Sequence, residues 1–112
     1  MKTLDFVREN AENRLLLQQQ LEKDYARMGE VFPNNFGIET LSWEQIIDSV
    51  RELTVNILEA GEPKLLQLLY LIDVPEKIFI ALLSKENFLE ELIMQIIQRE
   101  AEKIYFRQQY RS

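Results

Sequence analysis

Apolar residues recur along most of this chain at spacings of three and four, which is the period of an amphipathic α-helix. No stretch sustains the period-two alternation of a half-buried strand, and no Asn-Gly or Asp-Gly hairpin turn occurs. The pattern therefore predicts an all-α protein, a compact bundle of about five helices. We expect these helices at residues 3–28, 43–60, 63–72, 75–83 and 87–108.

Several helix ends are marked by residues with a preference for caps. Ser42 and Gln45 have the spacing of a capping box, in which each side chain bonds the backbone N–H of the other. Thr3 is the candidate N-cap of the first helix. Gly29 and Gly61 follow the first two helices, where glycine often ends a helix in a left-handed conformation.

The segment KLLQLLYLIDVPEKIFIALL, residues 64–83, is long enough to cross a membrane but carries charges near its centre. Asp73 and Lys77 there cost about 2.5–3.5 kcal/mol each on an insertion scale, which cancels the gain from the apolar residues. Pro75 also breaks a continuous helix. We predict two short buried helices that form a central hairpin, with a corner at Pro75 and Asp73 capping the second helix.

The longest apolar runs supply the predicted core, with Tyr25 and Tyr70 as core residues whose hydroxyls reach an edge. The predicted core residues are Leu66, Leu69, Ile72, Ile78, Leu82, Leu92, Ile93 and Ile96. The loop at 30–41 is also apolar, and we expect Val31, Phe32 and the other apolar side chains of the loop to fold over a core edge. A partner-binding loop is the alternative.

Composition narrows the function. The 112 residues form one predicted domain, 1–112, and contain no cysteine and no histidine. The commonest metal ligands and the commonest general base are therefore missing, and no catalytic or phosphate-binding motif is present. We expect no enzyme activity, no cofactor and no metal site. A net charge of −6 argues against nucleic-acid binding. The N-terminus lacks an apolar signal region, so a cytoplasmic location is expected.

The last helix changes its apolar side near Gln98, so its final turns are expected to extend past the core and to need another surface. That surface is the first helix, a second copy or a different protein. Residues 99–112 carry four basic and two acidic residues, with aromatics between them. Arg and aromatic residues are enriched at interfaces, although basic residues also complement the C-terminal end of a helix dipole. The candidate partner-binding residues are Arg99, Lys103, Tyr105, Phe106, Arg107 and Tyr110.

An acidic region precedes this basic end. Residues 30–62 contain seven acidic residues against one basic residue, a local net charge of −6. Glu44, Asp48 and Glu52 repeat every four residues along one helix edge. A metal site is disfavoured because no loop or histidine motif supports it, so the edge is either solvated or a contact surface. We hypothesise that the basic end docks on this edge, within the chain or across a two-fold axis.

Two functions follow. The first is a non-catalytic protein-interaction or assembly module that self-associates as a homodimer through the C-terminal helix; its partner is a second copy or another protein. The second is a small-molecule-binding protein or enzyme that uses carboxylates and tyrosines in a pocket between helices. An exposed apolar-aromatic patch without a deep cleft would favour the first, and a cavity of roughly 300 Å³ or more with converging polar groups the second.

Overall fold

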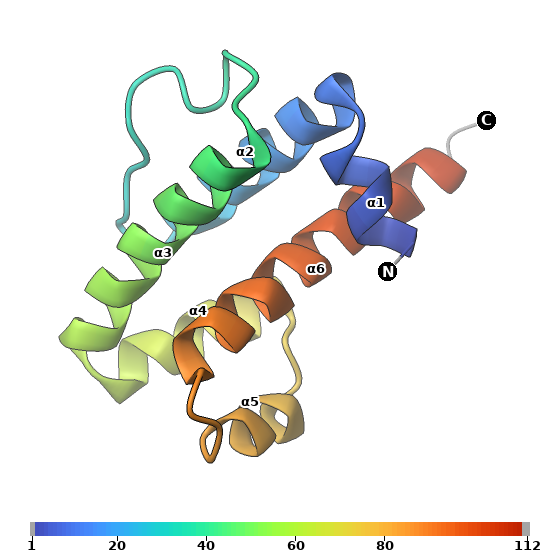
Figure 1. The fold of residues 1–112 in the computed structure, drawn as a ribbon. Coiled ribbons are helices and arrows are strands. Elements are labelled where there is room, and N and C mark those ends of the chain that lie inside the picture. Colours follow the sequence, from blue (N-terminus) through green and yellow to red (C-terminus); the bar gives the residue numbers. More distant parts are fainter. Residues whose placement is uncertain (1, 111–112) are drawn as a thin grey trace.

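The computed structural model describes residues 2–110, which fold into helices without a strand (Figure 1). The all-α class is confirmed, with six helices where about five were predicted. They are α1 (Lys2–Arg8), α2 (Ala11–Ala26), α3 (Trp43–Ala60), α4 (Glu62–Ile72), α5 (Glu76–Leu82) and α6 (Phe88–Gln109).

The prediction of one helix over 3–28 is wrong, because the helix ends at Arg8 and a second helix begins at Ala11. Asn10 adopts an extended conformation and caps α2, its side-chain oxygen accepting from the Asn13 backbone N–H at 3.0 Å. Thr3 lies inside α1 and is not its N-cap. The break lets α1 turn and pack on α6, where the rings of Phe6 and Tyr105 meet edge to face with centroids 5.2 Å apart.

Helix α6 is the centre of the bundle and contacts each of the other five helices. Its buried face continues from Leu92 through Ile97 to Ala101 and Ile104, so it reaches the C-terminal half of the helix. The end that was expected to project is therefore covered by α1 and α2 of the same chain. This leaves only one side of its last turns exposed.

The capping box at the start of α3 is confirmed. The Gln45 N–H donates to the Ser42 hydroxyl at 3.1 Å, and the Ser42 N–H donates to the Gln45 side-chain oxygen at 2.9 Å. Gly29 and Gly61 both have positive φ and follow α2 and α3, as predicted.

Replacing Ser42 with alanine removes one half of this capping box. We expect Ser42→Ala to lower the free energy of unfolding by about 1 kcal/mol, as for other N-cap serines. Urea denaturation measures the change. Ser49→Ala, inside α3, is the matched control, and an equal loss in both variants would contradict a specific capping role.

The 64–83 segment bends as predicted and forms α4 and α5 on either side of Pro75. Asp73, however, is the C-cap of α4, in a left-handed conformation with φ of 72°, and its side chain does not cap α5. The Arg99 guanidinium donates to both the carbonyl and the carboxylate of Asp73, which fastens the corner to α6. Among the described residues, no helix is long and apolar enough to cross a membrane.

Most of the predicted core is buried, including Leu69, Ile72 and Leu82. Leu66 and Tyr70 are exceptions, with exposed fractions of 39% and 88%. They lie on the outer side of α4, because a run of apolar residues does not indicate by itself which side faces the core. Tyr25 is fully buried, and its hydroxyl lies 2.9 Å from that of Thr54.

The 30–41 loop covers a core edge with only part of its apolar residues. Phe32 and Phe36 are buried and stacked, with ring centroids 4.0 Å apart, whereas Val31 and Ile38 are exposed. The buried Gln18 side chain holds the loop by donating to the carbonyls of Phe36 and Glu39 and accepting from the Leu41 N–H. The loop is therefore anchored to α2 by a residue that the hydrophobic pattern did not single out.

Candidate interaction site between α2 and α6

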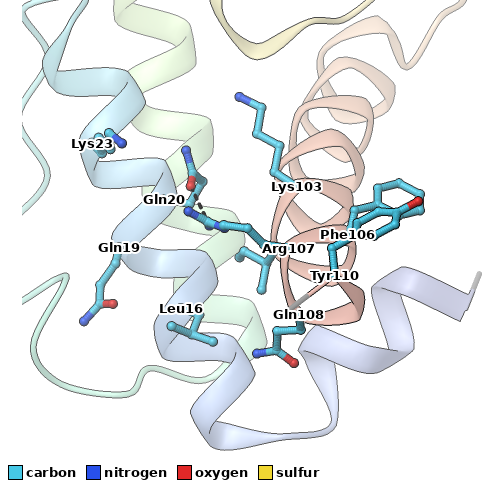
Figure 2. A pocket seen from close by; sticks show the side chains of 10 residues that line it. Leu16, Gln19, Gln20, Lys23, Lys103, Phe106, Arg107, Gln108 and Tyr110 are labelled. Carbon is cyan, nitrogen blue, oxygen red and sulfur yellow. Dashed lines mark hydrogen bonds between the residues drawn. The ribbon is translucent and has the colours of Figure 1, made fainter. Parts of the chain in front are cut away.

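An open groove of about 960 Å³ lies between α2 and the C-terminal half of α6 (Figure 2). Leu16 and the polar side chains of Gln19 and Gln20 line it from α2, and Gln108 lines it from α6. Phe106 and Tyr110 lie on the outer side of α6, away from α2. They are 48% and 87% exposed, so the groove borders an aromatic surface open to solvent.

Three cationic side chains line the groove, and none of its lining residues is acidic. They are Lys23 from α2 and Lys103 and Arg107 from α6. Lys23 is exposed and forms no ion pair within the described part of the chain. The Arg107 guanidinium donates to the neutral side-chain oxygen of Gln20 at 2.9 Å. In a chain of net charge −6, this groove is therefore a local positive surface.

Beneath the groove, Asp24 is the centre of a buried polar network. Its Oδ2 accepts from Lys103 Nζ and from Gln20 Nε2, each at 3.0 Å. Burial raises the pKa of Asp24, but hydrogen bonds from Glu100, Gln20 and Lys103 outweigh it, so the pKa lies below its ordinary value. Asp24 is therefore ionised at neutral pH and neutralises Lys103.

Glu100 completes this network from α6 and has no exposed surface. As a carboxylate it would have no hydrogen-bond donor on either oxygen, and Lys103 Nζ lies 3.8 Å from Oε1. Burial, with the hydrogen bond to Asp24 and the charge of Asp24, raises the pKa of Glu100 to about 9, against the opposing charges of Lys103 and Arg107. At neutral pH, Glu100 is thus a neutral acid that donates its proton to Asp24.

The structure brings four of the six C-terminal candidates to the groove, and these are Lys103, Phe106, Arg107 and Tyr110. The other two are used inside the chain. Arg99 bonds Asp73 and the Glu102 carboxylate, while Tyr105 packs between Phe6 and Phe106.

The acidic edge lies elsewhere. Glu44, Asp48 and Glu52 are exposed on α3, and Asp48 pairs with Arg51, which also pairs with Glu90 at the start of α6. Within residues 2–110 the basic side chains of α6 pair with Asp24, Asp73, Glu100 and Glu102 and with none of these three. The hypothesis that the basic end docks on this edge within the chain is therefore wrong. Docking between two copies stays a prediction.

The hydrophobic pattern left the α2 side of the groove unassigned, although it contained one signal. Leu16 is an apolar residue on the otherwise polar side of the first predicted helix, and it lies in the groove. Asp24 and Glu100 gave no such signal, because they read as ordinary charged residues of amphipathic helices. Their burial depends on which faces of α2 and α6 meet.

Within residues 2–110, no group of three or more acidic side chains is arranged to hold a metal ion. Comparison of the chain with protein-family models, curated proteins and solved structures finds no match. The geometry and charge of the groove are therefore the basis for assigning a function.

Proposed function

We propose that this protein is a non-catalytic interaction module that binds an acidic, partly apolar segment of a protein in the groove between α2 and α6. The observation that carries this proposal is the combination of three cationic side chains with Leu16 and an exposed aromatic border in one open groove. Carboxylates would pair with the cations, and apolar side chains would cover Leu16, which is 37% exposed. Arg and aromatic residues are enriched at such interfaces.

Access to the groove supports binding rather than catalysis. The perturbed carboxyl groups, Asp24 and Glu100, are not among the residues that line the groove, and Glu100 is fully buried. A group that acts as an acid or base must come within hydrogen-bond reach of its substrate. Of the tyrosines, Tyr110 alone lines the groove. These observations favour structural roles for the carboxyl pair.

The second candidate is binding of a small anionic molecule, because the groove exceeds roughly 300 Å³ and three cationic side chains line it. Its open shape is better suited to a helix or an extended segment than to a small molecule, which is usually enclosed on most sides.

A peptide titration tests the proposal. The probe is a labelled 18-residue helical peptide with Glu at every fourth position and Leu along one flank; the control probe has Lys in place of Glu. We expect the acidic peptide to bind and the Lys peptide not to bind. Arg107→Glu should weaken binding at least tenfold, because it replaces an exposed cation of the groove with an anion.

Lys85→Glu, at an exposed position between α5 and α6, makes the same charge change outside the groove and is the matched control. Citrate and phosphate are titrated in parallel. Equal binding of both peptides, or equal loss in the two variants, would contradict the proposal. Tighter binding of a small anion than of the acidic peptide would favour the second candidate instead.

A further inference from the structure

The exposed side of α3 has the chemistry that the groove requires. Glu44, Asp48 and Glu52 occur at every fourth residue and are all exposed, and Val55 continues the row as a half-buried apolar residue. Eight residues of helix span about 12 Å, so the carboxylates follow one another at steps of about 6 Å. Lys103 is already paired with Asp24, so the cations of the groove without an acidic partner among the described residues are Lys23 on α2 and Arg107 on α6. An α3 helix laid between α2 and α6 can therefore pair carboxylates of its row with these two cations.

The row also faces away from the body of its own chain. At 100° per residue, Glu44, Asp48 and Glu52 are centred about 180° from the buried residues of α3, which include Ile46, Val50 and Ile57. Figure 2 looks onto the groove with α3 behind α2 and α6. The groove and the acidic row therefore lie on opposite faces of one molecule, which explains why the two charged surfaces do not meet within the chain.

We propose that the groove between α2 and α6 of one molecule binds the acidic row of α3 in a second copy, head to tail. This inference rests on the proposed function of the groove and names its occupant. In a two-fold dimer both patches would have to lie on one shared face, because the same surface of each subunit enters the contact. Patches on opposite faces instead leave one groove and one row free at the ends, so the contact propagates into chains or closes into rings.

Like charges disfavour the alternative in which two grooves face each other. Such a dimer would bring Lys23 and Arg107 of one copy against the same residues of the other. Pairing of a groove with an acidic row instead joins opposite charges, and the association should weaken as salt screens them.

Two complementary variants test this geometry by blocking one surface each. Lys23→Gln with Arg107→Gln neutralises the groove and leaves Lys103 with Asp24, while Glu44→Lys with Glu52→Lys reverses the row. A neutral groove does not attract the reversed row, so a mixture of the two variants cannot form the second contact. The charge-matched control is Glu76→Lys with Glu86→Lys, at two exposed positions outside both surfaces. Circular dichroism confirms that each variant is folded, and sedimentation velocity measures mass at several concentrations and salt levels.

We expect wild type and the charge-matched control to form species larger than dimers as concentration rises, and less so at high salt. Each blocked variant alone should stay at the monomer mass of 13.4 kDa. An equimolar mixture of the two should form a dimer and nothing larger, because one free row meets one free groove.

A wild-type protein that is monomeric at every concentration would overturn the head-to-tail contact, as would a mixture that does not associate. A discrete dimer of wild type that persists in both blocked variants would also overturn it. The acidic-peptide titration separates these failures from failure of the proposed function. If wild type is monomeric but still binds the acidic peptide, the groove is a binding site whose occupant is not a second copy.

Discussion

Glu100→Gln should make the protein more stable at neutral and mildly alkaline pH, although it replaces a fully buried residue. The glutamine amide can donate to Asp24 as the protonated glutamic acid does, and it cannot ionise. We expect the free energy of unfolding of Glu100→Gln to exceed that of wild type by about 4 kcal/mol at pH 7.5, with a larger difference at higher pH.

The sign follows from the pKa of Glu100, which burial and Asp24 raise from an ordinary value of 4.5 to about 9. Between these values the folded state holds a proton that the unfolded state has lost. The contribution of Glu100 to stability is therefore complete below pH 4.5 and falls by about 1.4 kcal/mol per pH unit as the pH rises toward 9. Asp24 has a lowered pKa and the opposite dependence, so its contribution falls as the medium becomes acidic.

Urea denaturation at intervals between pH 5.5 and 8.5 measures both slopes. Wild type should lose stability across this range more steeply than Glu100→Gln. The control is Glu86→Gln, which removes the same charge at an exposed position and should keep the slope of wild type. Parallel curves for wild type and Glu100→Gln would show that Glu100 does not hold a proton in the folded state.

Local signals along the chain predicted most of the helices because they act over a few residues. The capping box of Ser42 and Gln45 and the corner at Pro75 are examples, and both formed as expected. The break before α2 carried no glycine or proline. Asn10 is compatible with a helix interior or a cap, and the packing of α1 on α6 determines which is adopted.

Only the α6 side of the candidate site was predicted from the sequence, because the α2 side also depends on how the helices pack. Basic and aromatic residues at the end of α6 were recognisable as a surface, and Lys103 and Arg107 do line the groove. Asp24 and Glu100 are polar residues whose burial arises where two helices meet. A pattern along one helix does not contain that information, and the pKa of a carboxyl group depends on these neighbours.

The buried amide of Gln18 illustrates the same limit and leads to the second large effect. Gln18→Ala should lower the free energy of unfolding by about 3 kcal/mol, because it leaves the carbonyls of Phe36 and Glu39 and the N–H of Leu41 without their partner. The amide of Leu41 should also lose its protection from hydrogen exchange, since Gln18 is its acceptor.

Gln19→Ala is the neighbouring control for this prediction. Gln19 is exposed and donates one hydrogen bond to the same loop, at the Gly37 carbonyl, so its loss should cost less than about 1 kcal/mol and leave the Leu41 amide protected. If the two variants cost the same, or if the Leu41 amide exchanges at the wild-type rate in Gln18→Ala, the loop is held by its buried phenylalanines. If the variants differ as expected, a single buried amide determines how an apolar loop is fastened to α2.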